Sequence, residues 1–535
     1  MVNLQNPNFV FHSETNSPGG VMQLIAQNQD IFLNFGPNVK NNHNLARQRG
    51  VVFGLPFSTA FAEGLRGGMF PPMSNLYRDL PGKPQNLGEL NDLLVNSTRI
   101  EPELVQRQVA LAQTTARLEH QGVIVSHPHE DAYGGVSYLL PSIPVVASEE
   151  TLETIRLKEE ISSRHQDEVL EIKRRDLPKV GRGYQTQQRE MKPVKFGEPV
   201  ALGSFGKNLI HKVDHMLGAG AIEVEMPNGG PRVVDTLDMG VGPNTENFIN
   251  TVWGAGDVDL LVLDATSIGG GERFNKPQTN FAKALEEKVY AYPQGNAFVE
   301  MPQRHMQRLM ELIEVGQRTK RKVFVPIDMA YYASTLLPES MQSAFSIYLP
   351  QRQSRSYVAS DYPKEFGDIA FGVNGERNPG VLTIEEVVQE VEGDRSLVVL
   401  DNPNYLMQMA SSGDVSHRNI RNPRTQKPEG HQNIYISAGY NYPTQASTSA
   451  AIDAAENAGL LYKEISITDH VPDDVMAEYL LNMTSKVILA VHTSNPENAR
   501  AFVKRIQPKA IVPTISRSGL YEITGGPKGI RRVEL

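Results

Sequence analysis

Short apolar runs recur along this chain and predict strands, while the longer segments between them have helical spacing. Residues 21–26 and 30–36 form two apolar runs with a polar turn between them. Residues 101–121 carry apolar side chains at a spacing that predicts a helix, and residues 122–126 (Gly-Val-Ile-Val-Ser) predict the next strand. Further strands are predicted at 145–148, 208–215, 221–225, 232–236 and 259–264. Strands that alternate with helices in this way are typical of an α/β fold.

A glycine run interrupts this pattern and divides the chain. Gly269, Gly270 and Gly271 follow the apolar strand 259–264, so we place a boundary after residue 268. The three glycines could cradle a phosphate, but a flexible junction between domains is the favoured interpretation. Beyond them the pattern predicts helix over residues 280–320. Strands are predicted at 322–326, 396–401, 433–437 and 486–492, and a helix opens at 495–498.

Composition narrows the class of protein. The 535 residues are 40% hydrophobic and 21% charged, which gives ample length for a large core and suggests two to four domains. The net charge of −9 is not typical of a general nucleic-acid binder, although a basic groove can lie within an acidic total. The absence of cysteine excludes disulfides and Cys-ligated metal. With no signal peptide and no membrane-spanning run, we expect a cytoplasmic protein.

The most informative stretch is His127-Pro-His129-Glu-Asp131, which comes directly after the predicted strand 122–126. Two histidines at i and i+2, with an aspartate two residues further on, can turn three metal-binding groups toward one point. Imidazole and carboxylate suit a borderline cation such as Zn²⁺. The alternative is an exposed polar loop that holds two of the 13 histidines. Gly134-Gly135 then allows a tight turn into the next element.

This motif and its successors resemble the metallo-β-lactamase-fold hydrolases. That family has a His-x-His-x-Asp-His loop followed by Gly-Gly, and then an isolated His, a bridging Asp and a final His. His127, His129 and Asp131 match the loop, and His215 and Asp238 match the isolated His and the bridging Asp. The resemblance implies an αββα sandwich of two facing sheets with helices outside.

The segment after Asp264-Ala-Thr-Ser is similar to the β-CASP insertion of nucleic-acid-processing members, in particular RNase J-type enzymes. Ser437-Ala-Gly-Tyr and Val491-His492-Thr-Ser resemble later motifs of that group. The resemblance implies an α/β β-CASP-like domain inserted into the core. The domains are then 1–268 for the first part of the core, 269–484 for the insertion and 485–535 for the return of the core.

Two positions depart from the family pattern. Ala132 replaces the last histidine of the first loop, and Ile515 replaces the terminal histidine. The resemblance therefore implies one complete metal site, made by His127, His129, His215 and Asp238, and an incomplete second site. We expect one Zn²⁺, with Mn²⁺ as the alternative. Restoring histidine at both altered positions is expected to create a second metal site.

Two functions follow from these matches. The first is a metal-dependent phosphodiesterase or ribonuclease like RNase J, in which Asp131 orients or deprotonates the metal-activated water and His492 protonates the leaving oxygen. His492 could instead be a satisfied core histidine, and Asp264 a structural carboxylate that binds loop amides. The second function is a catalytically impaired homologue that binds nucleic acid or a partner protein, which the two lost ligands favour.

The expected partners are nucleic acid, in particular RNA, and a second copy of the chain in a homo-oligomer such as a dimer, with no membrane. In the family that this chain resembles, nucleic acid threads between the core and the insertion. Candidates for substrate contacts are Asp264, Ser437, Arg273 and Arg517, with Lys276 and Lys528 as further basic residues. The alternative is that these cations are scattered surface charges. The basic segment 176–195 is either a solvated surface or a polyanion contact.

Overall fold

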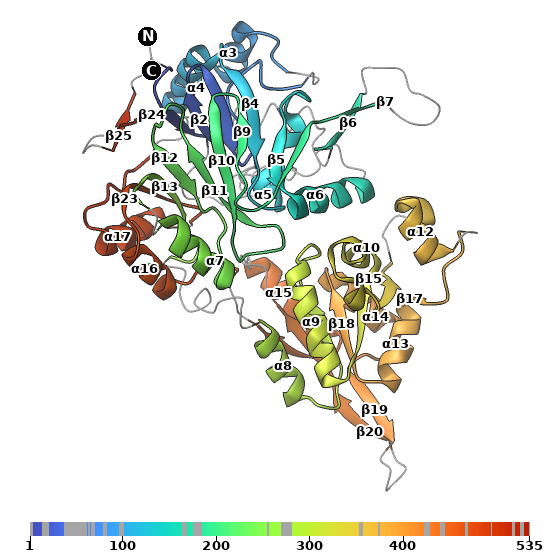
Figure 1. The fold of residues 1–535 in the computed structure, drawn as a ribbon. Coiled ribbons are helices and arrows are strands. Elements are labelled where there is room, and N and C mark those ends of the chain that lie inside the picture. Colours follow the sequence, from blue (N-terminus) through green and yellow to red (C-terminus); the bar gives the residue numbers. More distant parts are fainter. Residues whose placement is uncertain are drawn as a thin grey trace. The chain divides into compact units, whose positions relative to one another are not determined.

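The computed structural model describes most of the chain. The described residues are 4–12, 21–36, 61, 65, 70–78, 83–95, 101–162, 168–174, 185–253, 256–268, 281–351, 357–372, 375–421, 428–438, 445–465, 469–493, 495–515, 519–524 and 529–533. The chain divides into two compact units. Unit 1 combines Met1–Asn275 with His470–Leu535, and unit 2 is Lys276–Asp469 (Figure 1).

Within the described part of unit 1, the first sheet has eight strands in the order β25-β24-β1-β2-β3-β4-β5-β8. Their bounds are β1 Asn8–Phe11, β2 Met22–Ala26, β3 Gln29–Leu33, β4 Glu119–Ile124, β5 Val145–Ser148, β8 Met191–Val194, β24 Gly519–Ile523 and β25 Ile530–Arg532. Strand β2 is antiparallel to its neighbours β1 and β3, whereas β3, β4, β5 and β8 run parallel to one another. The carboxyl ends of β3, β4 and β5 therefore lie at one edge of the sheet.

The second sheet of unit 1 has six described strands in the order β23-β13-β12-β11-β10-β9. Their bounds are β9 Val200–Leu202, β10 Phe205–Lys212, β11 Gly220–Glu225, β12 Arg232–Asp235, β13 Val258–Asp264 and β23 Ser485–Val491. The strands β12, β13 and β23 are parallel, so their carboxyl ends also share one edge. Strand β13 is buried along almost its whole length, as its continuous apolar sequence predicts.

Helices cover the outer face of each sheet. One apolar core lies between the sheets and draws on both, for example through Ile31 and Leu260. A second core packs the first sheet against α3 (Leu87–Val95), α4 (Pro102–Thr115), α5 (Glu130–Tyr133) and α6 (Glu149–Ile161). A third packs the other sheet against α7 (Pro243–Phe248), a π-helical turn at Ile249–Trp253, α16 (Asp473–Leu481) and α17 (Pro496–Ile506). Unit 1 therefore has helix–sheet–sheet–helix layers, and the predicted mixed α/β class is confirmed.

The basic segment 176–195 lies partly outside the described residues, but Arg189 is described and is buried. Arg189 lies between β7 (Gln185–Gln188) and β8 in the chain, and β7 pairs with β6 (Glu171–Arg174). The guanidinium of Arg189 donates hydrogen bonds to five backbone carbonyls. These belong to Val136, Leu139, Leu140, Ile143 and Val169. Burial, assisted by the nearby Arg78, lowers the pKa of Arg189 to about 9. Arg189 therefore stabilises loop carbonyls and is not available to a polyanion.

Replacing Arg189 with methionine should lower the free energy of unfolding by about 3 kcal/mol, since it removes charged hydrogen bonds and leaves buried carbonyls unpaired. Urea denaturation would measure the loss. The matched control is Arg156→Met on α6, where the guanidinium is 42% exposed and pairs with Glu153 and Glu160 near the surface. That change should cost less than about 1 kcal/mol. Equal losses in the two variants would contradict the structural role given to Arg189.

Unit 2 is built on an all-parallel sheet whose seven described strands have the order β17-β16-β15-β18-β14-β21-β22. The strands are β14 Ala297–Glu300, β15 Lys322–Pro326, β16 Ser346–Leu349, β17 Val381–Thr383, β18 Ser396–Leu400, β21 Ile434–Ser437 and β22 Leu461–Glu464. A separate hairpin pairs β19 (His417–Arg421) with β20 (Pro428–Gln432). Residues 280–320, predicted as helix, instead contain β14, because residues 297–300 are buried beside β18 and β21.

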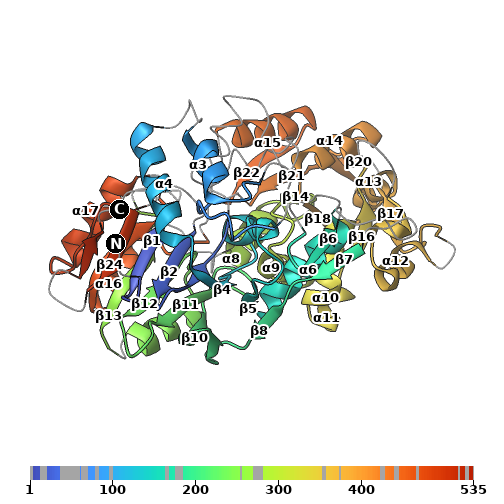
Figure 2. The same ribbon diagram turned by 90° about the horizontal axis from the view of Figure 1, so that it is seen from above.

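Helices lie on both faces of this sheet, as a parallel sheet requires. One face packs against α13 (Ile384–Gly393), α14 (Pro403–Ser412) and α15 (Gln445–Asn457), and Figure 2 shows these three helices together on one side of the strands. The remaining helices are α8 Phe281–Ala291, α9 Met306–Thr319, α10 Ile327–Leu336, α11 Glu339–Gln342 and α12 Lys364–Phe371. Unit 2 is thus a doubly covered parallel sheet with its own core.

Two carboxylates end adjacent strands of this sheet. Asp328 follows β15 and Asp401 follows β18. Asp328 accepts a hydrogen bond from Tyr362, while Asp401 Oδ1 is buried and makes no hydrogen bond within the described structure. Burial first, and then the charge of Asp328, raises the pKa of Asp401 to about 7. The folded state therefore favours the protonated form of Asp401.

Candidate metal centre

The first candidate ligands follow β4, where the chain passes from a buried strand into a short helix. Ser126 and His127 are buried just beyond the strand, and His129 precedes the first turn of α5. Asp131 lies within that turn. Because β4 is parallel to its neighbours β3 and β5, these side chains emerge at the carboxyl edge of the sheet.

The other two ligands of this group come from the second sheet. His215 follows β10, and Asp238 follows β12. The residue before His215 fixes the turn, since the Asp214 carboxylate accepts hydrogen bonds from the Thr245 backbone N–H (2.9 Å) and the Asn244 amide (2.7 Å) at the start of α7. The loops that follow β10 and β12 in the second sheet therefore meet the loop that follows β4 in the first sheet.

Four ligand atoms of this group lie around one point. His127 Nε2, His215 Nε2 and His129 Nδ1 lie 3.3, 3.5 and 4.0 Å from Asp238 Oδ2, and His215 Nε2 lies 3.3 Å from His129 Nδ1. Ligand atoms about 2.0–2.1 Å from a tetrahedral Zn²⁺ are about 3.3–3.4 Å from each other. Three of the four observed separations are 3.3–3.5 Å and the fourth is 4.0 Å, so the group could hold one metal ion.

The protonation states of the group also suit a cation. Burial lowers the pKa of His215 to about 3 and also lowers that of His129, so these imidazoles are neutral. Burial opposes ionisation of Asp238, but His492 and His127 together hold its pKa well below the usual range. Among the described atoms, the buried His127 Nε2 has no hydrogen-bond partner. A buried polar atom without a partner is costly, and a metal ion in this group would satisfy it.

Asn34, at the end of β3, holds both ligand loops. Its side-chain oxygen accepts hydrogen bonds from the Ser126 backbone N–H (2.9 Å) and hydroxyl (2.8 Å), and its amide donates to Asp235 Oδ2 at 3.5 Å. Because the Ser126 hydroxyl donates to Asn34, it accepts from Nδ1 of His127 at 2.8 Å. That contact leaves the lone pair of His127 on Nε2, which faces Asp238. Outer contacts of this kind orient metal ligands.

Replacing Asn34 with alanine should weaken metal binding by about 10–100-fold, the usual effect of losing such outer contacts. Competition with a chelator of known affinity would measure the change. Asn28→Ala is a matched control, because Asn28 has a similar left-handed backbone (φ 58° against 56° for Asn34) but lies in the exposed turn between β2 and β3. A similar loss of affinity in both variants would show that backbone strain, and not the loop contacts, is responsible.

A second group of candidate ligands shares Asp238 with the first. It consists of Asp238, Asp264, His470 and His492. Asp264 ends β13, His492 follows β23, and His470 is the first residue of the returning segment of unit 1. The Nδ1 atom of His492 lies 2.9 Å from Asp238 Oδ1 and 3.6 Å from Asp264 Oδ1, and His470 Nδ1 lies 2.7 Å from Asp264 Oδ2.

Backbone and hydroxyl groups fix this second group in place. Asp264 accepts hydrogen bonds from the backbone N–H groups of Thr266 (3.0 Å) and Met239 (3.3 Å) and from the Thr266 hydroxyl (2.6 Å). The Thr266 hydroxyl also lies 2.7 Å from His492 Nδ1. Asp264 therefore binds loop amides, as one of its two expected roles required, while also facing the two histidines.

Asp131 lies beside both groups, and its Oδ2 atom is 3.5 Å from His492 Nε2. Burial acts to raise the pKa of Asp131, but the contact with His492 and the charges of His127 and His129 lower it overall. Asp131 is therefore an ionised carboxylate that could accept a proton from a neighbouring water.

The two positions that depart from the family pattern point into apolar cores. Ala132 is fully buried in the core beneath the helices of the first sheet, and Ile515 is buried in the core between the sheets. At Ala132 the backbone of Gly36 lies against residues 131 and 132, which leaves little room for an imidazole, whereas at Ile515 an imidazole would be a polar group in an apolar core. Restoring histidine, which the sequence suggested as a repair, should therefore overpack the core at position 132 and bury a polar group at position 515, each at a cost of about 1–3 kcal/mol.

The remaining candidates fall elsewhere. Ser437 ends β21 in unit 2, where its hydroxyl lies 3.3 Å from Glu300. Arg273, Lys276, Arg517 and Lys528 lie outside the described residues. The sequence argument missed His470, which belongs to no recognised motif. Its one signal is the dipeptide Asp469-His470, which repeats the Asp214-His215 pair.

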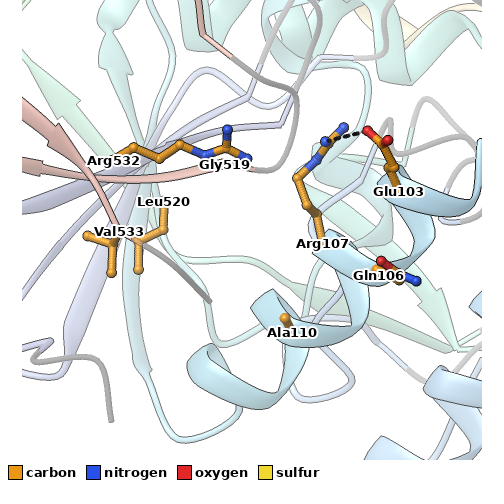
Figure 3. A pocket seen from close by; sticks show the side chains of 8 residues that line it. All are labelled: Glu103, Gln106, Arg107, Ala110, Gly519, Leu520, Arg532 and Val533. Atoms are coloured by element: carbon orange, nitrogen blue, oxygen red, sulfur yellow. Dashed lines mark ion pairs between the residues drawn. The ribbon is translucent and has the colours of Figure 1, made fainter.

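A surface pocket of about 580 Å³ lies in another part of unit 1, between α4, β24 and β25 (Figure 3). It is lined by Glu103, Gln106, Arg107, Ala110, Gly519, Leu520, Arg532 and Val533. Figure 3 shows the ion pair between Arg107 and Glu103, whose closest atoms are 4.0 Å apart. No residue of this pocket belongs to either metal-ligand group, so the pocket adds nothing to the metal chemistry. Separately, no helix among the described residues is long and apolar enough to cross a membrane.

Comparison of the sequence with protein-family models and with curated proteins finds no match. Among solved structures, a protein of unknown function from Enterococcus faecalis V583 is similar with a TM-score of 0.64 and 14% identity, over 96% of this chain and 99% of that one. A subclass B3 metallo-β-lactamase from a soil metagenome library, MEM-A1, matches 49% of this chain and 80% of its own with a TM-score of 0.23 and 14% identity. The first likeness shows a shared fold that spans both units.

Proposed function

We propose that this chain is a metal-dependent hydrolase that cleaves phosphodiester bonds in nucleic acid, in particular RNA. The observation that carries the proposal is the first ligand group, in which three histidines and Asp238 have the separations of a tetrahedral metal site beside an ionised Asp131. The choice of nucleic acid rests on the sequence resemblance to β-CASP proteins. The helix–sheet–sheet–helix layers of unit 1 and the separate parallel sheet of unit 2 are consistent with that resemblance.

A metal ion at this site would lower the pKa of a bound water toward about 7 and polarise a phosphoryl oxygen. The protein supplies the rest. His129 and His215 are neutral, the Ser126 contact orients His127 to offer its Nε2 lone pair, and Asn34 and Asp214 fix the loops that carry these histidines. Asp131 accepts the proton of the attacking water.

The impaired-homologue alternative rested on the two lost ligands at Ala132 and Ile515. The second group, assembled from Asp264, His470 and His492 around Asp238, weakens that argument, because it offers other ligands near the same place. We therefore favour the hydrolase.

The test is hydrolysis of an end-labelled single-stranded RNA by the full chain after removal and return of metal. We expect cleavage with added Zn²⁺ or Mn²⁺ and none with a chelator. Asp131→Asn should retain bound metal but lose about 10²–10⁴-fold in rate, the usual contribution of a positioned base. Metal-loaded protein that cleaves neither RNA nor a simple phosphodiester such as bis(p-nitrophenyl) phosphate would refute the proposal.

A further inference from the structure

The two carboxylate oxygens of Asp238 face different partners. Its Oδ2 lies 3.3–4.0 Å from the three histidines of the first group, while its Oδ1 lies 2.9 Å from Nδ1 of His492. A carboxylate with one oxygen directed to each of two ligand sets is positioned to bridge two cations. We infer that the chain binds a second divalent metal ion, held by Asp238, Asp264, His470 and His492. This inference deepens the proposed function and shares its metal centre.

The second ligand set does not use the positions that the family pattern uses. Those positions are Ala132 and Ile515, whose side chains lie in apolar cores. The ligands come instead from the ends of β13 and β23 and from the segment that begins at His470. Strands β13 and β23 are parallel neighbours, with Asp264 paired to Val491, so Asp264 and His492 necessarily emerge side by side. This placement follows from the register of the sheet.

The donor set suits a borderline divalent cation. Two carboxylates and two imidazoles bind Zn²⁺ or Mn²⁺, and adjacent ligands about 2.1 Å from an octahedral ion are about 3 Å apart. The 2.9 and 3.6 Å separations of His492 Nδ1 from Asp238 and Asp264 bracket that distance. Burial gives a second reason. Asp238 and Asp264 are 4% and 2% exposed, and buried charges are expected to be paired or to coordinate metal.

The rival explanation is a metal-free network. His470 and Asp264 can form an ion pair, and the Thr266 hydroxyl can bond to His492. In that network the four side chains would only support the first site. The two explanations differ in the number of ions that the folded chain holds, and this number can be counted without any enzyme assay.

The experiment counts metal per chain by mass spectrometry after the full chain is stripped, reloaded with Mn²⁺ or Zn²⁺ and passed over a desalting column. We expect two ions for the unaltered protein and one for His470→Ala and for Asp264→Asn. His211→Ala is the matched control and should keep both ions, because His211 pairs with Glu223 outside either group. Circular dichroism would confirm that each variant is folded.

Electron paramagnetic resonance of the Mn²⁺-loaded protein gives an independent reading. Two ions bridged by Asp238 should show a spin-coupled spectrum, which becomes that of an isolated ion in His470→Ala. One ion per chain in the unaltered protein, or two ions without coupling, would overturn the inference, the second result meaning an adventitious ion elsewhere. Two coupled ions without RNA hydrolysis would refute the proposed function and leave this inference intact. A single bound ion together with RNA hydrolysis would refute this inference and leave the proposed function intact.

Discussion

Asp238→Asn is expected to have the largest effect of any single substitution, with loss of both metal ions and a fall in hydrolysis of at least about 10³-fold. Asp238 contacts all three histidines of the first group and His492 of the second, so no other residue belongs to both groups. Asparagine keeps the size of the side chain but carries no charge. The loss of electrostatic stabilisation from a metal is worth several kcal/mol of the barrier, which corresponds to such a fall.

Metal content and the rate of RNA hydrolysis would be measured for Asp238→Asn and for two comparison variants. Asp264→Asn should lose only the second ion, since Asp264 is absent from the first group. Asp259→Asn should keep both ions, because the Asp259 carboxylate pairs with Lys486 and with the backbone of Arg232. If Asp238→Asn retained a full complement of metal, the bridging position of Asp238 would be disproved.

The sequence predicted the parts of the site that depend on local order. The spacing of His127, His129 and Asp131 after an apolar strand is visible in the ten residues 122–131, and the strand does end just before them. His215 and Asp238 were found through the order of the family motifs. His127, His129, His215 and Asp238 lie together in the structure because each follows a strand whose carboxyl end lies at the same edge of its sheet.

The assembly of the second ligand group, and its member His470, could not be predicted in this way. Asp264 contacts His470, 206 residues later in the chain, and Thr266 contacts His492, 226 residues later. Neither separation leaves a periodic pattern, because the long segment of unit 2 intervenes. The parallel pairing of β13 with β23 brings Asp264 and Thr266 beside His492. Sequence reasoning found the departures at Ala132 and Ile515 and singled out Asp264 and His492 through the family motifs, but it gave these two residues other roles and missed His470.

A local pattern also failed in unit 2, where a helix was predicted over residues 280–320. Strand β14 occupies the middle of that segment and is an interior strand of the sheet, between β18 and β21. A short buried strand has too few residues for its period to stand out from the helices on either side. Tertiary pairing with two neighbours decides its conformation.

Asp401→Asn should stabilise unit 2, and the gain should grow with pH. Burial and Asp328 raise the pKa of Asp401 from 3.8 to about 7. An acid whose pKa is higher in the folded state binds protons more tightly there, so its contribution to stability is greatest below about pH 4 and falls as pH rises to about 7. At about 1.4 kcal/mol for each pKa unit, the largest gain from a neutral side chain is about 4 kcal/mol above pH 7.

Hydrogen exchange of the β18 amides, measured at pH 5 and pH 8 after correction for intrinsic rates, would report this gain for unit 2. Protection in Asp401→Asn should exceed that of the unaltered chain by more at pH 8 than at pH 5. Asp394→Asn is the control, because Asp394 is 58% exposed and pairs with Lys322 at the surface, where an ion pair is worth less than about 1 kcal/mol. An equal gain at both pH values would mean that the substitution improves packing or hydrogen bonding, and that Asp401 is not held protonated in the folded protein.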